Sequence, residues 1–130
     1  MNTDKIASDV AMHITYGCLV VPVDVELYDD TVLHIREEIL AKVRETRVKG
    51  VIIDLSGVSV IDSFSGGVIQ DTAKAVSLLG ATTVISGLQP ETAAVLVDLN
   101  LYFEGIAKTS TLEAGLRLLQ SAAAGRGEGK

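Results

Sequence analysis

The sequence is poor in several residue types, and each scarcity excludes a class of protein. Its 130 residues contain no Trp, two Phe, three Tyr and a single Cys. One thiol forms neither an internal disulfide nor a metal cluster, so Cys18, inside an apolar run, is expected to be a small buried core residue. The few aromatic side chains predict a core made of aliphatic residues.

Basic residues are also few, since 11 Lys and Arg stand against 17 Asp and Glu and the net charge is −6. Nucleic acid is therefore not an expected partner, because phosphate contacts need clustered basic side chains. An acidic surface suits a protein partner with basic patches. No apolar run reaches the roughly 18 residues that span a bilayer, and no signal peptide is recognised. A cytoplasmic protein without a membrane partner is the expectation.

The residues that are present predict one globular domain. The chain is 48% hydrophobic with a mean hydropathy of +0.38. This apolar content is high for the size, which is consistent with some surface being covered by other subunits. We expect a flexible N-terminus over residues 1–9, a domain over 10–123 and a disordered Gly-rich tail over 124–130.

Hydrophobic periodicity predicts a hairpin followed by alternating helices and strands. Expected strands cover residues 10–15, 18–23, 51–55, 82–86 and 103–107. Expected helices begin near residues 29, 63, 90 and 110, the last with a Ser110-x-x-Glu113 capping box and an end near Ala123. Strand–helix–strand units need parallel pairing. The predicted fold class is therefore α/β, a mixed sheet of about five strands with about four helices.

The most informative stretch is Val51–Asp54 followed by Asp62-Ser63-Phe64-Ser65-Gly66-Gly67. The first part is typical of a buried parallel strand, and the second of a helix start with Ser63 on its cap. This order places Ser63 at the carboxyl end of the sheet, where open α/β folds carry their functional residues.

Several other chemistries fit the residues less well. Gly57, Gly66 and Gly67 match no phosphate-binding loop, and the pair after Ser65 is expected to let another backbone approach the helix. His13 and His34 are isolated, so we expect no metal and no cofactor. Asp54 ends a central strand as a phosphorylated aspartate does in a receiver domain, but no Lys follows the strand at 82–86.

Three interpretations of Ser63 stay open on the residues alone. A helix-cap serine often has only a structural role. A hydrolase would need a base near Ser63, and neither histidine is close in the sequence. An exposed cap hydroxyl is also well placed to accept phosphate, because helix N–H groups tolerate the added charge.

The chain over about residues 8–120 resembles the STAS domain, the family of anti-sigma factor antagonists. The residues that carry the resemblance are the strand Val51–Leu55, Ile61-Asp62-Ser63 at a helix start, and Ser86-Gly87-Leu88-Gln89-Pro90 after the next expected strand. Within the family the chain looks most similar to the RsbS-type scaffolds of the stressosome. Free antagonists carry D-S-S-G where this chain has Asp62-Ser63-Phe64.

The resemblance implies a non-enzymatic signalling protein. Ser63 would be the primary phosphorylation site and Ser86 a possible second one, or else only a strand-end hydroxyl. Asp62, Ser63, Phe64, Ser65 and Gly66 would form the partner-binding surface.

The implied partners are RsbR-like paralogues, an RsbT-like serine kinase that is released on phosphorylation, a PP2C-type phosphatase, and further copies of the chain. The alternative is a free antagonist that binds an anti-sigma kinase one to one.

Overall fold

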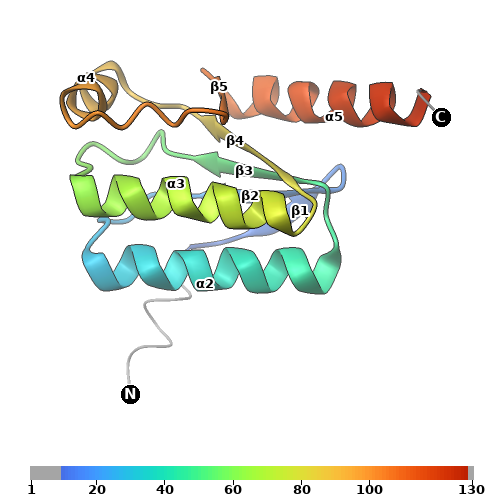
Figure 1. The fold of residues 1–130 in the computed structure, drawn as a ribbon, viewed down its shortest axis with the longest axis horizontal. Helices are drawn as coiled ribbons and strands as arrows, with labels where there is room; N and C mark the ends of the chain where they lie inside the picture. Colours follow the sequence, from blue (N-terminus) through green and yellow to red (C-terminus); the bar gives the residue numbers. More distant parts are fainter. Residues whose placement is uncertain (1–9, 129–130) are drawn as a thin grey trace.

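A five-stranded sheet organises residues 10–128, the part of the chain that the computed structural model describes (Figure 1). The strands lie in sequence order. They are β1 (His13–Thr15), β2 (Cys18–Pro22), β3 (Gly50–Asp54), β4 (Thr82–Ser86) and β5 (Ala107–Thr109). The β1–β2 pair is antiparallel and the other three pairs are parallel. The predicted mixed α/β sheet is therefore confirmed.

Four described helices connect and cover the strands. They are α2 (Asp29–Thr46), α3 (Ser63–Leu78), α4 (Pro90–Asp98) and α5 (Leu112–Glu128). Figure 1 shows α2 and α3 side by side along one face of the sheet, α5 on the other face, and α4 beyond the carboxyl ends of the strands. None of these described helices combines the length and the apolar character of a membrane span.

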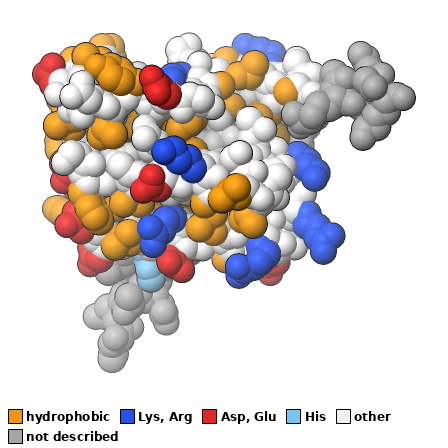
Figure 2. Space-filling model, viewed as in Figure 1, with side chains coloured by type: hydrophobic (Ala, Val, Ile, Leu, Met, Phe, Trp, Pro, Cys, Tyr) orange, Lys and Arg blue, Asp and Glu red, His pale blue; other side chains and the backbone are white. Residues whose placement is uncertain are grey.

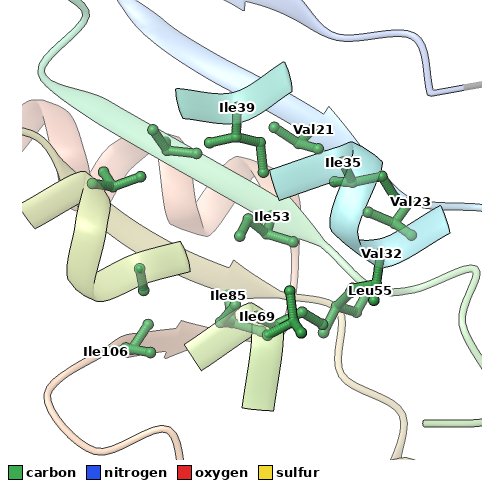
Figure 3. Packing of buried hydrophobic residues seen from close by; sticks show 14 of the residues in the cluster. Val21, Val23, Val32, Ile35, Ile39, Ile53, Leu55, Ile69, Ile85 and Ile106 are labelled. Atoms are coloured by element: carbon green, nitrogen blue, oxygen red, sulfur yellow. The ribbon is translucent and has the colours of Figure 1, made fainter. Parts of the chain in front are cut away.

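Strand alternation divides the core between the two faces of the sheet. Val51 and Ile53 of β3 point toward α2 and α3, while Ile52 points toward α5 and Leu119. Figure 3 shows the larger cluster, in which aliphatic side chains from β2, β3, β4, α2 and α3 point toward one another. Cys18 is a buried free thiol on the α5 side, and burial raises its pKa, which makes the thiolate rare.

Several element boundaries differ from the sequence predictions, and the first strand begins at His13 and not at Val10. The last strand begins at Ala107, not Phe103, because residues 103–105 form a turn with positive φ at Phe103 (49°) and Gly105 (77°). The cap of α5 is Thr111, whose Oγ1 accepts a hydrogen bond from Ala114 N at 3.1 Å, so Ser110 lies one residue too early.

The structure describes only one of the two predicted ends of the domain, and that end differs from the prediction. The helix α5 continues to Glu128, past the predicted end at Ala123 and through most of the expected tail. The expected flexible segment 1–9 and the last residues, 129–130, lie outside the described residues.

Candidate functional site

The N-terminus of α3 lies at the carboxyl edge of the sheet and is fixed by a reciprocal cap. The Asp62 carboxylate accepts hydrogen bonds from Ser65 N and Ser65 Oγ, both at 2.8 Å. In return, Asp62 N donates to Ser65 Oγ at 3.1 Å. These bonds hold the pKa of Asp62 below its usual range, so this exposed carboxylate remains charged at neutral pH.

The cap places Ser63 differently from the sequence prediction. The N-cap residue is Asp62, and Ser63 is the first residue of the helix. Ser63 is exposed, as are its neighbours Asp62 and Phe64. Because the Asp62–Ser65 pair makes the cap, the Ser63 hydroxyl has no part in it. A hydroxyl in this position can be modified without loss of the helix start.

Two residues predicted for the partner-binding surface are buried instead. Ser65 is 1% exposed because it faces inward as the second member of the cap. Gly66 is buried against α4 and the segment after that helix, and a Cβ there would lie 2.7 Å from Leu101 Cδ1. The expected close approach at this glycine is thus made by a side chain and not by a backbone. Ser65 and Gly66 support the surface from below.

The loop before α3 is held by the beginning of α4. Gln89 Nε2 donates to Ser56 O at 2.7 Å. The buried hydroxyl of Thr92 lies 3.3 Å from Val58 O and 3.4 Å from Ser59 O. Sequence reasoning missed both donors. Thr92 could have been found, because it lies one turn before the buried Leu96 and a hydroxyl on an inward face needs a partner.

Ser86 is not accessible in this structure, although it ends the neighbouring strand. Its side chain is completely buried, with Oγ 3.4 Å from Asp54 Oδ1. The same carboxylate oxygen accepts a hydrogen bond from Ser56 N at 3.1 Å. Gly87 closes over this group with φ +72°, and a Cβ there would meet Asp54 Oδ1 at 2.7 Å. A kinase cannot reach Ser86 unless this edge opens.

The surface around Ser63 combines acidic and apolar groups. Phe64 is 43% exposed and Val60 is 72% exposed. Asp24 and Glu26 border a shallow cavity of about 310 Å³ beside Val60. Figure 2 shows acidic side chains mainly toward the left edge, where the strands end, and basic side chains mainly toward the right. The exposed part of the predicted set is therefore Asp62, Ser63 and Phe64.

No titratable cluster accompanies Ser63 that would suggest metal chemistry. Within residues 10–128, no three His, Cys, Asp or Glu side chains are grouped as metal ligands would be. His13 is exposed on β1 and His34 is half-buried on α2.

Comparison with known proteins relates this architecture to bacterial stress signalling. The "RsbT co-antagonist protein RsbRC" of Bacillus subtilis (strain 168) is 38% identical over 82 residues, which are 63% of this chain and 29% of that protein. RsbRD from the same organism is 30% identical over 105 residues, 81% of this chain and 38% of that protein. The chain thus spans well under half the length of these relatives.

Solved structures include proteins of nearly the same size. A serine-to-glutamate variant of Moorella thermoacetica RsbS superimposes with a TM-score of 0.79 at 30% identity, covering 88% of this chain and 97% of that one. The model of the STAS domain matches residues 9–114, which include all five strands and the N-terminus of α3. The fold, the exposed serine at the α3 start and this match agree that the chain belongs to the STAS domain family.

Proposed function

We propose that this chain is a non-enzymatic stressosome-type scaffold that holds a serine switch kinase and releases it when Ser63 is phosphorylated. It would assemble in the cytoplasm with further copies of itself and with RsbR-like paralogues. The kinase would be RsbT-like, and a PP2C-type phosphatase would restore the resting state. The single observation that carries this proposal is the exposed Ser63 hydroxyl at a helix start that is capped by other groups.

The chemistry of the α3 N-terminus supports a switch based on charge. Phosphorylation would add about −1.5 to −2 charges, which the N-terminal end of a helix dipole tolerates. The added charge would lie beside Asp62, whose hydrogen bonds with Ser65 keep it ionised. A partner bound over Phe64 would then face both added bulk and repulsion, while the helix beneath would remain formed.

The similarity to RsbS supports a scaffold, and the RsbR relatives are named as co-antagonists of RsbT. Ser86 has no primary role in this proposal because it is buried. The partner-binding surface consists of Asp62, Ser63 and Phe64, with Val60 beside it.

Phosphate transfer tests the site directly. The full chain is incubated with an RsbT-like kinase and ATP, and the phosphate is located by mass spectrometry. One phosphate on Ser63 is expected, and the Ser63→Ala variant should take up none. Ser59→Ala is the matched control, since Ser59 is an exposed serine of the same loop, and it should be phosphorylated normally. Phosphate on another residue would contradict the site assignment.

Kinase capture tests the mechanism, and particle size tests the scaffold role. Ser63→Asp should lower the affinity for the kinase at least about tenfold, or about 1.4 kcal/mol, while Ser59→Asp should not. Full retention of the kinase by Ser63→Asp would reject the charge mechanism. Light scattering with an RsbR-like paralogue should give a very large particle. A monomer or dimer there would favour the free antagonist.

A further inference from the structure

A groove of about 280 Å³ lies at the amino edge of the sheet, where β2 and β3 begin. Residues from the β1–β2 turn, the loop after α2 and the helix α5 line it, among them Tyr16, Lys49 and Leu119. Figure 1 shows this turn and this loop at the same end of the sheet. The α3 start lies at the opposite, carboxyl edge, so one molecule cannot bring the groove and Ser63 together.

Two large side chains at the amino edge have backbone conformations that favour smaller residues. Tyr16, in the β1–β2 turn, has φ +52° and is 76% exposed. Arg47 follows the last residue of α2 with φ +59° and is also exposed. Turns and helix ends with this left-handed backbone usually carry Gly or Asn. Because neither side chain is buried in the domain, a contact with another molecule would account for both.

The charge of this edge is positive. The connection from α2 to β3 contains Arg47 and Lys49 and no acid, and both side chains are exposed. Among the described residues the one ion pair is Arg36–Glu37, so these two cations have no ionic partner there. The backbone of Lys49 is held in place, because its carbonyl accepts a hydrogen bond from Thr82 N at 3.0 Å. An aromatic ring and an unpaired cation thus border one groove.

The α3 start has the complementary chemistry. Phe64 is 43% exposed and lies close to the exposed carboxylate of Asp62. The connections that leave the carboxyl ends of β2 and β3 contain Asp24, Glu26 and Asp62 and no Lys or Arg. Figure 2 shows the resulting separation of acidic and basic side chains across the molecule. An apolar group flanked by negative charge therefore stands at one edge, and an aromatic groove flanked by positive charge at the other.

We propose that the groove of one copy receives the α3 start of a second copy. Phe64 would lie against the ring of Tyr16, a contact that aromatic pairs favour. Asp62 would face Lys49 across the interface. The two surfaces are different, so the contact is head to tail and repeats from copy to copy into a ring or an open chain. The proposal rests on the proposed function, because it assigns a surface to the assembly with further copies.

This contact would also regulate access to Ser63. A second copy docked over the α3 start covers Ser63, so it would compete with the kinase for the same surface. Phosphate on Ser63 would add negative charge opposite Lys49 and Arg47, and arginine and lysine both bind phosphate well. Phosphorylation would then weaken the hold on the kinase and strengthen the contact between copies at the same time.

Two variants with complementary defects test the contact. Lys49→Glu reverses the charge at the groove and keeps the α3 start, whereas Phe64→Ala truncates the α3 start and keeps the groove. Each variant should associate with itself at least about tenfold more weakly than the wild type does. A fluorescently labelled Phe64→Ala protein, sedimented with unlabelled Lys49→Glu protein, should form a complex, because one intact groove meets one intact α3 start. No complex in the mixture would overturn the proposal, as would self-association of either variant as strong as that of the mixture.

Controls separate the contact from general effects of charge and apolar surface. Lys74→Glu makes the same change of charge on α3 outside this groove, and Val97→Ala truncates a 53% exposed apolar side chain on α4. Both should associate as the wild type does, and a loss equal to that of Lys49→Glu would reject the groove. Tyr16→Asn should raise the melting temperature and weaken the association, a combination that a purely structural tyrosine would not give.

A final pair of measurements separates this contact from the proposed function. Ser63→Asp, added to the Lys49→Glu variant, should raise its affinity for the Phe64→Ala variant about threefold at low salt. Unchanged affinity would reject the effect of phosphorylation on the contact. The Lys49→Glu variant should still be phosphorylated on Ser63 by an RsbT-like kinase. Normal phosphorylation without any complex would reject the contact alone, whereas a wild type that takes up no phosphate would reject the proposed function.

Discussion

Ser63 and Ser86 lie at the same edge of the sheet, yet they differ completely in access. Ser86 is the last residue of β4, completely buried beside Asp54, whereas Ser63 is an exposed first residue of α3. A strand end leaves its side chain within the layer of the sheet, while the first residue of a helix can face away from it. A hydroxyl at the carboxyl edge is therefore a candidate for modification only when the local element turns it outward.

The largest expected effect on stability comes from a negative charge at Ser86, which is the buried one of the two serines. Ser86→Asp would put a second carboxylate beside Asp54 with no cation to pair with it. We expect the free energy of unfolding to fall by about 3 kcal/mol or more. Urea unfolding followed by circular dichroism measures this. Ser86→Ala is the control and should cost about 1 kcal/mol or less, since it removes one long hydrogen bond. Equal losses of stability in Ser86→Asp and Ser86→Ala would mean that this edge of the sheet opens readily.

Substitution of Gly87 tests whether its backbone keeps Ser86 covered. Gly87→Ala should cost about 2 kcal/mol, because φ is +72° and the new Cβ would lie 2.7 Å from Asp54 Oδ1. Gly67→Ala is the matched control on α3, where a Cβ meets nothing within 4 Å. It should stabilise the protein by about 0.5–1 kcal/mol, because alanine is the better helix former. If both variants changed the free energy of unfolding in the same direction, this role of Gly87 would be contradicted.

Removal of the cap beside Ser63 is expected to have an intermediate effect on the free energy of unfolding. Asp62→Ala removes the side chain that accepts from Ser65 and should cost about 1 kcal/mol. Asp62→Asn keeps an effective cap and should cost less. The unfolding free energies of the two variants at neutral pH provide the measurement. A loss in Asp62→Asn as large as in Asp62→Ala would assign the effect to charge, not to capping.

The same carboxylate predicts a pH dependence of stability. Because folding lowers the pKa of Asp62, its contribution is present above the unfolded value, near 3.8, and is lost as the pH falls through the lower folded value. The stability advantage of the wild type over Asp62→Asn should therefore shrink between about pH 5 and about pH 2. A constant difference across that range would show that the hydrogen bonds do not depend on ionisation.

The smallest effect is expected at Ser63 itself. Ser63→Asp should change the free energy of unfolding by less than about 0.5 kcal/mol, because attraction to the helix dipole is offset by repulsion from Asp62. Urea unfolding of the variant beside the wild type measures the change. A much larger loss would mean that the Ser63 hydroxyl stabilises the fold, which would contradict the cap described above.

The sequence was sufficient for the architecture because the pattern of apolar residues follows directly from the layers. The continuous run Val51–Leu55 indicated a strand covered on both faces. Hydrophobic periodicity after residue 29 indicated a helix, and the structure packs its buried residues Val32, Ile35, Ile39 and Val43 on one of these faces. The last strand was misplaced because Phe103 and Ile106 are β-formers that the fold uses as core residues of a turn.

The candidate site was predictable only where it depends on residues that are neighbours in the sequence. Asp62, Ser63 and Phe64 were placed on the surface correctly by the helix start. The burial of Ser65 and Gly66 depends on the cap and on packing against residues 96–101, which no local pattern encodes. The contacts from Gln89 and Thr92 to the loop are equally distant in the sequence.

At the start of α3 the helix cap and the exposed hydroxyl belong to different residues, and this separation affects how such proteins can diversify. Since Asp62 and Ser65 secure the fold there, natural selection can replace the serine at position 63 with threonine, with a permanent acid or with an inert side chain at little structural risk. With Ser63 as the proposed phosphorylation site, the timing and sensitivity of the switch could then be changed at one codon while the architecture is inherited unchanged.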